Sequence, residues 1–134
     1  DLLKYRPYLI KPNDEELAEW FGLINPSLEE IKDCGQKLLE KGAENVLVSL
    51  GEKGAILFTP TETIHVTAPK GEVVNTACAG DTLLATFVGS QLLGLSNEEA
   101  LIKAVAAGSS TAFRPGLTDF SDVPTLMQQI NRIL

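Results

Sequence analysis

Val-Leu-Val-Ser-Leu-Gly-Glu-Lys-Gly-Ala-Ile-Leu-Phe-Thr, residues 46–59, decides the fold class. The run Val46–Leu50 is apolar and is bounded by turn signals, which is the pattern of a strand buried on both faces. The residues from Gly51 to Gly54 predict a turn, and Ala55–Thr59 returns as a second strand. This stretch therefore predicts the interior of a sheet.

The segments on either side predict helices and further strands. We expect a short strand over 7–10, helices capped by Asn13, Ser27 and Ser96, a half-exposed strand over 63–67, a helix over 81–95 and an amphipathic helix over 123–134. The caps are followed by acidic first turns, which favour helix N-termini. Strands that alternate with helices indicate an α/β architecture with a mainly parallel sheet. No repeat or long linker is visible, so a single structural unit is expected.

Composition limits the classes of function. The chain has 134 residues, of which 44% are hydrophobic, and a formal net charge of −7. This hydrophobic fraction excludes general disorder, and the acidic balance argues against nucleic acid or a membrane surface as partner. No run reaches the roughly 18 apolar residues of a membrane span. Two cysteines, Cys34 and Cys78, are too few for a disulfide scaffold, and we expect free thiols and a cytoplasmic location.

A loop of small residues, from Asn75 to Gly80, precedes an apolar helix. Small residues let the backbone approach a ligand closely, and the first amides of a helix have no partner within the helix. Together with the helix dipole, these amides predict an anion site. Asp81, in the first turn, places a carboxylate beside the predicted phosphate position, where it could accept a proton from an attacking hydroxyl.

The loop Thr76-Ala77-Cys78-Ala79-Gly80-Asp81-Thr82 resembles the signature of the ribokinase-like carbohydrate kinases of the phosphofructokinase B type. Three further segments resemble motifs of that family in the same order: Lys11–Glu16 (Lys-Pro-Asn-Asp-Glu-Glu), Ser49–Gly54 (Ser-Leu-Gly-Glu-Lys-Gly), and Ala106–Ser109 with the turn Arg114-Pro115-Gly116. The resemblance implies a three-layer ribokinase-like fold, of which residues 1–134 form the C-terminal, nucleotide-binding part. The N-terminal, sugar-binding part would then be absent, in keeping with a first residue that is not Met.

The resemblance also implies roles for individual residues. Asp81 would be the catalytic base, and the amides of Cys78, Ala79 and Gly80 would join that of Asp81 in an anion hole. ATP would be bound by Lys11, Asn13, Ser49, Leu50, Gly51, Glu52, Lys53 and Gly54 at the phosphates, and by Val105 and Ser109 at the adenine. Asn13 and Glu16 would organise Mg²⁺ and its waters.

Cys78 and His65 are two further residues that could take part in chemistry. Cys78 stands where the family has a glycine, so the site depends on a right-handed backbone there; a thiol at a helix N-terminus should also have a lowered pKa. Cys78 is an improbable nucleophile, because His65, the single histidine, is expected to be an ordinary strand residue with no orienting partner. Neither residue suggests a zinc site.

The wording of the motifs resembles most the kinases of phosphorylated ketohexoses. The expected reaction converts fructose 1-phosphate to fructose 1,6-bisphosphate with ATP, with tagatose 6-phosphate as second choice of acceptor. Two alternatives stay open: a ribokinase- or nucleoside-type kinase with a neutral acceptor, and a non-catalytic nucleotide-binding module. The resemblance allows a homodimer of the full-length protein. The isolated chain is expected to be inactive.

Overall fold

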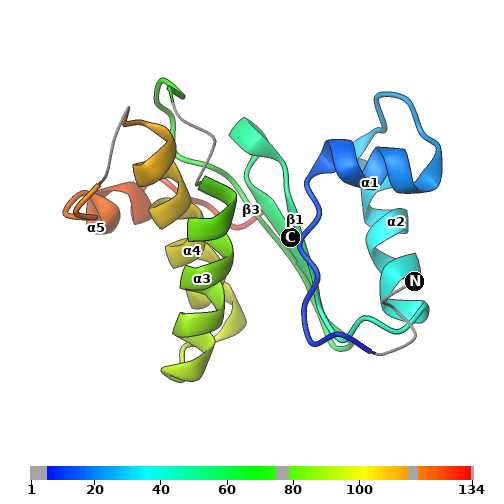
Figure 1. Ribbon diagram of the computed structural model, residues 1–134. Coiled ribbons are helices and arrows are strands. Elements are labelled where there is room, and N and C mark those ends of the chain that lie inside the picture. The colour runs from blue at the N-terminus through cyan, green and yellow to red at the C-terminus, as the bar shows by residue number, and fades with distance from the viewer. Residues whose placement is uncertain (1–5, 75–78, 115–117, 134) are drawn as a thin grey trace. The chain divides into compact units, whose positions relative to one another are not determined.

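The chain folds into helices and strands that belong to two compact units. The computed structural model describes residues 6–74, 79–114 and 118–133 (Figure 1). The first unit comprises Asp1–Gly51 and Ile56–Ile64, and the second comprises Glu52–Ala55 and His65–Leu134. The sequence predicted a single unit, because no linker or change of composition marks the boundary. The chain passes from one unit to the other after residues 51, 55 and 64.

The first unit begins with two helices whose N-termini are fixed by capping boxes. Helix α1 spans Asp14–Phe21 and helix α2 spans Leu28–Glu40. The Oδ1 of Asn13 accepts a hydrogen bond from the Glu16 amide at 2.7 Å, and the Ser27 hydroxyl caps α2 in the same way. Each cap satisfies amides that the helix itself leaves without a partner. Both predicted helix starts are confirmed.

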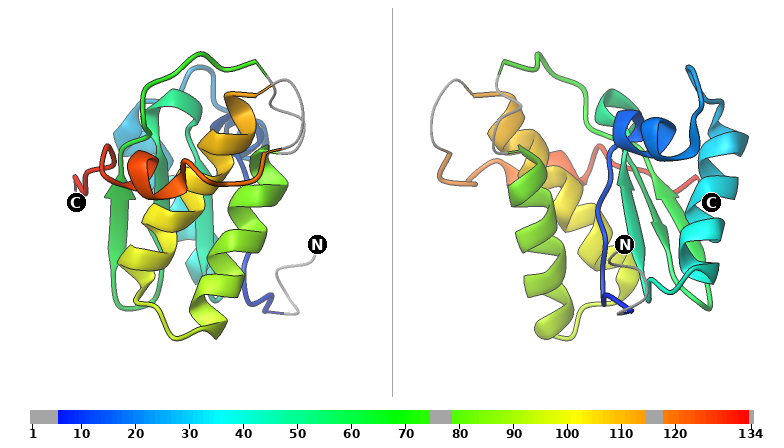
Figure 2. Two further views of the ribbon diagram at one scale, coloured as in Figure 1. Left: turned by 90° about the vertical axis from the view of Figure 1, so that its left-hand side faces the viewer. Right: turned by 45° about the vertical axis from the view of Figure 1, so that its right-hand side comes forward.

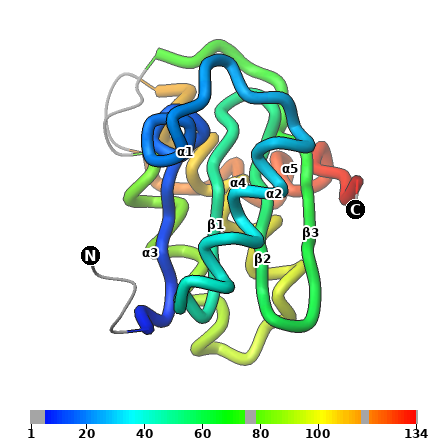
Figure 3. Tube along the Cα trace, turned by 90° about the vertical axis from the view of Figure 1, so that its right-hand side faces the viewer, coloured from blue at the N-terminus to red at the C-terminus, as the bar shows by residue number. Residues whose placement is uncertain are grey.

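Three short strands form a sheet in the order β1-β2-β3 (Figure 3). They are β1 (Val46–Ser49), β2 (Ala55–Phe58) and β3 (Thr63–Val66). Turns this short can join only antiparallel neighbours. The expected strand over 7–10 is reduced to isolated parallel bridges, from Ile10 to Val46 and from Asn13 to Ser49. The predicted α/β class is confirmed. Among the described residues, parallel pairing occurs at these two bridges to β1, whereas the strands joined by short turns are antiparallel.

The core of the first unit lies between α2 and the strands. Ile31, Cys34 and Leu38 of α2 are buried in one cluster with residues of β1 and β2. A Cβ added to Gly35 would collide with the ring of Phe58, which is itself fully buried. Helix α2 therefore packs against β2 through a position that admits no side chain.

The second unit is built on two adjacent helices. Helix α3 spans Ala79–Leu92 and helix α4 spans Asn97–Ala112, and the views agree that they lie side by side (Figure 2). A Cβ on Gly108 would come within 3.2 Å of the carbonyl oxygen of Ala79, so this glycine permits close approach of α4 to the start of α3. In the parts of the chain described, no helix has the length and apolar character needed to cross a membrane.

Two predictions about the remaining elements are wrong. The final helix, α5, covers Val123–Met127 instead of reaching residue 134. The following residues pair with β3, through the bridge from Val66 to Arg132 and the hydrogen bond from the Ile133 amide to the His65 carbonyl oxygen at 2.7 Å. This pairing satisfies backbone groups that a longer helix would have satisfied internally. Ile64, His65 and Val66 are all buried, so β3 is not half-exposed as expected.

The turn between β1 and β2 depends on Gly54. Residues Gly51–Lys53 form a single 3₁₀ turn, after which Gly54 adopts φ +95°. A Cβ on Gly54 would overlap the carbonyl oxygen of Val66, whereas Gly51, at φ +60°, has open space around it. Both positions favour glycine for their backbone conformation, but Gly54 is also enclosed.

We therefore expect Gly54→Ala to be much more destabilising than Gly51→Ala. The Gly51 variant should lose about 1–2 kcal/mol from its left-handed backbone alone. The Gly54 variant should lose about 3 kcal/mol or more, because the overlap adds to that strain. Urea unfolding of both variants measures the difference. Equal losses would show that the approach of Val66 does not constrain the turn.

Candidate functional site

In the first unit, the Lys-Pro-Asn segment lies beside the end of β1. The Leu47 amide donates to the Ile10 carbonyl oxygen at 2.9 Å, and the Ser49 amide donates to that of Pro12 at 3.1 Å. These bonds align the segment with β1, so that Asn13 bridges Ser49 at the point where the strand ends. The structure thus brings together Asn13 and Ser49, which the sequence assigned to one site from distant motifs.

Asn13 and Glu16 bind each other across the first turn of α1. The Glu16 amide donates to Asn13 Oδ1, and the Asn13 amide donates to Glu16 Oε1 at 3.0 Å. Glu16 is exposed, and a carboxylate has more lone pairs than this single bond occupies. The pair is therefore held in place by the cap while its oxygens keep acceptor capacity for Mg²⁺ or for waters around it. Oxygen ligands of this kind fit Mg²⁺, because this ion keeps several of its waters when it is bound.

The residues of the predicted phosphate loop, 49–54, differ in their exposure to solvent. Leu50 is buried, while Gly51, Glu52 and Lys53 are exposed. The Nε2 of His65 lies 3.3 Å from the carbonyl oxygen of Lys53. His65 is 4% exposed, and so it is a buried residue that contacts the turn. The sequence offered no signal for this contact, because the two residues are far apart in the chain.

The start of α3 carries the predicted catalytic residues of the second unit. The helix begins at Ala79, two residues before the expected start, so Ala79, Gly80 and Asp81 all lie in its first turn. Amides in a first turn have no acceptor within the helix. Ala79 and Gly80 are half-buried, and Asp81 is exposed. Cys78 and the preceding loop residues 75–77 lie outside the described residues.

Val105 and Ser109 lie one turn apart on α4. Val105 is 6% exposed and Ser109 is half-buried, so that Ser109 is the more accessible of the two. A spacing of four residues places both side chains on the same face of the helix. The predicted adenine-contacting pair therefore shares one face, although no contact with a base can be read from the chain itself.

A polar cluster at the end of α4 was not predicted. Arg114 Nη1 donates to Asp122 Oδ2 at 2.7 Å and to the Ser110 hydroxyl oxygen at 3.1 Å. The Ser110 hydroxyl in turn donates to Asp122 Oδ1 at 2.6 Å and lies 2.7 Å from the Thr118 hydroxyl oxygen. These four residues, the Arg114 cluster, hold the chain beyond α4 against its last turn. The spacing of the four in the sequence matches no motif, which is why it gave no signal.

The cluster shifts the pKa of Asp122. Burial acts to raise this pKa, but the hydrogen bond from Ser110 and the hydrogen bond and charge of Arg114 outweigh burial and hold the pKa below its usual range. Hydrogen bonds donated to a carboxylate favour its charged form. The cluster is therefore an ion pair supported by hydroxyl groups.

The described cysteine is a core residue. Cys34 is free and buried in α2, and burial raises the pKa of its thiol despite the opposing charge of Lys37. A thiol in this state is a poor nucleophile and a poor metal ligand. Across residues 6–74, 79–114 and 118–133, no three His, Cys, Asp or Glu side chains gather where they could hold a metal ion.

A single protein family covers the predicted site residues of both units. The family described as "pfkB family carbohydrate kinase" matches residues 1–125, and the chain belongs to this family. The family prediction made from the four motifs is confirmed. Carbohydrate kinases of this family use ATP, which agrees with the predicted nucleotide.

Relatives and solved structures agree with this assignment. The chain is 54% identical to D-tagatose-1-phosphate kinase of Bacillus licheniformis over 97% of its residues, and 41% identical to 1-phosphofructokinase of Bacillus subtilis over 93%. It matches the structure of an Arabidopsis thaliana ribokinase complexed with ribose and ATP, with a TM-score of 0.79 and 34% identity over 90% of the chain. The chain spans 43%, 41% and 41% of these three proteins.

The Arg114 cluster predicts how stability depends on pH. Because the folded pKa of Asp122 is lowered, its bonds stabilise the fold above the ordinary carboxyl pKa of about 3.9 and are lost as pH falls through the folded value. Asp122→Asn should cost roughly 1–2 kcal/mol at pH 7, since the side chain is 27% exposed and partly screened. The deficit should shrink below about pH 4.

Urea unfolding between pH 3 and 7 measures this, with Asp33→Asn as control. Asp33 is an exposed aspartate on α2, and its replacement should change stability by no more than about 0.5 kcal/mol. A deficit for Asp122→Asn that stays constant over the whole pH range would contradict the assignment.

Proposed function

We propose that this chain is the nucleotide-binding part of an ATP-dependent sugar-phosphate kinase. The reaction transfers the γ-phosphoryl group of ATP to the C6 hydroxyl of fructose 1-phosphate, giving fructose 1,6-bisphosphate. The observation that carries the proposal is the exposed Asp81 carboxylate in the first turn of α3, beside amides without helical acceptors. A general base and an anion site are the two groups that phosphoryl transfer requires of the protein.

In the second unit, residues at the start of α3 act on the γ-phosphoryl group, and residues of α4 contact the adenine of ATP. Asp81 accepts the proton of the attacking hydroxyl, and the amides of Cys78, Ala79, Gly80 and Asp81 stabilise charge on the transferring group. Val105 and Ser109 border the adenine, as the resemblance implies. Glu52, Lys53 and Gly54 contribute the distal part of the phosphate loop.

In the first unit, the residues beside the end of β1 bind the phosphates of ATP. Ser49, Leu50 and Gly51 form the proximal part of the phosphate loop, and Gly51 allows backbone approach because its surroundings are open. Lys11 reaches a phosphate as a point charge. Asn13 and Glu16 hold Mg²⁺ through water. That ion, when bound, neutralises charge on the phosphates.

The acceptor is a ketohexose carrying its phosphate at C1. The two relatives named above act, by their names, on fructose 1-phosphate and tagatose 1-phosphate, which differ in configuration at C4. Neither name supports tagatose 6-phosphate, our second expectation. The 54% identity makes tagatose 1-phosphate the strongest competitor. A neutral acceptor is supported by the ribokinase solved with ribose, at lower identity.

The remaining parts of the proposal rest on resemblance. We infer that the whole kinase forms a homodimer and acts in the cytoplasm. The 134-residue chain by itself should bind ATP weakly and phosphorylate no sugar, since in this family most sugar contacts come from the other part of the protein.

Replacement of Asp81 tests the catalytic assignment. In a protein extended to the full length of the relatives, Asp81→Asn should lower kcat at least a hundredfold, which is the scale of a general base. The KM for ATP should stay within about threefold, because the isosteric amide leaves the amides of α3 in place. Steady-state kinetics provide both values. Asp33→Asn is the matched control, and unchanged turnover in Asp81→Asn would refute the role of Asp81.

Turnover of four acceptors distinguishes the substrate classes. We expect kcat/KM to be highest with fructose 1-phosphate, then tagatose 1-phosphate, and at least a hundredfold lower with tagatose 6-phosphate and with ribose. A missing phosphate leaves the charged groups that recognise it without a partner, which is costly. Preference for ribose would place the protein with the neutral-acceptor kinases. ATP binding without turnover of any of the four would favour the non-catalytic module.

A further inference from the structure

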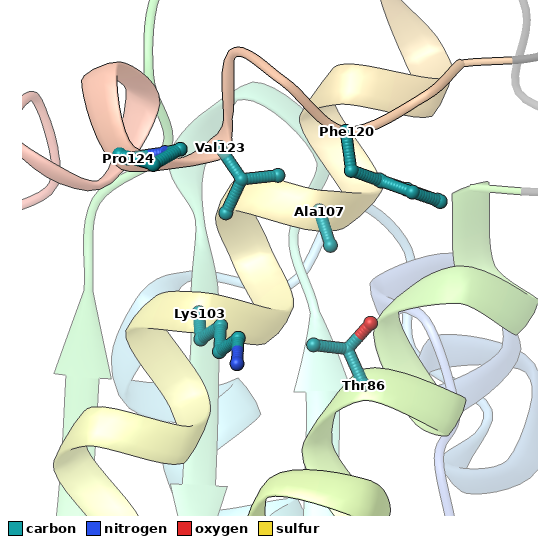
Figure 4. Close-up of a pocket in the computed structure, with 6 residues that line it drawn as sticks. All are labelled: Thr86, Lys103, Ala107, Phe120, Val123 and Pro124. Carbon is teal, nitrogen blue, oxygen red and sulfur yellow. The ribbon is translucent and has the colours of Figure 1, made fainter.

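The second unit contains a pocket whose lining residues have no role in the proposed kinase reaction. It has a volume of about 320 Å³ and is lined by Thr86, Lys103, Ala107, Phe120, Val123 and Pro124 (Figure 4). This volume lies in the range of small-molecule sites, which are mainly apolar with a few polar groups that fix the ligand. Here the polar groups are one ammonium and one hydroxyl.

This pocket uses a different face of α4 from the proposed adenine contacts. Lys103 and Ala107 are one turn apart and share a face, as do Val105 and Ser109. The two pairs are offset by two residues, or about 200° around the helix. Helix α4 thus presents one pair to the proposed nucleotide and the other to the pocket.

Lys103 supplies a positive charge that no residue in the described ranges pairs with. Its side chain extends from α4 toward α3 at one side of the pocket (Figure 4). Glu99, one turn earlier, has its carboxylate hydrogen-bonded to the Ser96 hydroxyl at 2.9 Å. Thr86 on α3 lies across the pocket from Lys103, with its methyl group on the side of α4 and its hydroxyl on the side of Phe120 (Figure 4). An anionic group between α3 and α4 would therefore meet an ammonium and a hydroxyl donor.

Phe120, which lines the pocket, has a strained backbone conformation. Its φ of +62° is rare for a bulky residue, and the side chain is still 43% exposed. Such a conformation persists where the surroundings determine it, often at ligand sites. Here the Thr118 hydroxyl accepts from the Phe120 amide at 3.0 Å, and the Phe120 carbonyl oxygen accepts from the Val123 amide at 3.1 Å. Because Thr118 belongs to the Arg114 cluster, that cluster also holds the backbone of Phe120, whose side chain lines the pocket.

We propose that this pocket binds a small aromatic monocarboxylate. The ring would stack on Phe120 and contact Ala107, Val123 and Pro124, while the carboxylate would bind Lys103 and Thr86. A single ammonium suits one carboxylate better than a polyphosphate, which needs several cations or a row of amides. None of the residues that line the pocket has a role in the proposed kinase reaction, and so the proposal does not depend on the proposed function.

Titration of the ¹⁵N-labelled chain with 2-naphthoate tests the site, with neutral 2-naphthalenemethanol as matched probe. We expect saturable amide shifts in α3, α4 and residues 118–124, and at least tenfold weaker binding of the alcohol. Lys103→Met should weaken naphthoate binding at least tenfold and leave the alcohol unchanged, and Lys103→Arg should restore most of the affinity. Phe120→Ala should weaken both probes.

The control is Lys70→Met, which removes an exposed lysine of the same unit outside the pocket. It should change neither affinity. The proposal is overturned if naphthoate gives no saturable shifts around the pocket, if both probes bind equally, or if Lys70→Met weakens binding as much as Lys103→Met. Thermal unfolding of each variant shows whether a loss of binding reflects a loss of fold; should Lys103→Met unfold, the comparison of the two probes on the unmodified chain decides.

Discussion

The parallel bridge between Asn13 and Ser49 is the contact on which the first unit depends. Asn13 has its backbone paired with the end of β1 and its side chain at the first turn of α1. One residue thus ends an extended segment, starts a helix, and fixes Glu16 through the reciprocal bond of the cap. The proposed phosphate and Mg²⁺ ligands of this unit follow from that arrangement, since both Lys11 and Glu16 are placed by it.

Close backbone approach has the corresponding role in the second unit. Gly108 allows α4 to approach the carbonyl oxygen of Ala79, where α3 begins. Any side chain at this position would push against the first turn that carries Asp81. Packing of two helices and the placement of the proposed base are therefore a single constraint. The same helix, α4, ends in the Arg114 cluster, which orders the chain as far as the start of α5.

Local signals predicted well what local interactions determine. The caps at Asn13, Ser27 and Ser96, the buried strand at Val46 and the motif order needed only neighbouring residues or a family pattern. The failures involve partners distant in the chain. Residues 128–133 have a helical pattern, but 131–133 pair with β3 and Thr67. His65 contacts the turn at Lys53, and the Arg114 cluster joins residues as far apart as Ser110 and Asp122. Side-chain periodicity carries no information on such partners. The role of Cys78 stays a prediction.

The most direct test of the central claim is an amide-shift titration of the ¹⁵N-labelled chain with Mg²⁺ and a non-hydrolysable ATP analogue. If the chain is the nucleotide-binding part of a carbohydrate kinase, weak but saturable shifts should appear at Ser49–Gly54, at Ala79–Asp81 and at Ser109. Shifts at Asn13 and Glu16 should require Mg²⁺. Absence of saturable shifts at all of these positions, or saturation confined to the pocket around Lys103, would contradict the account.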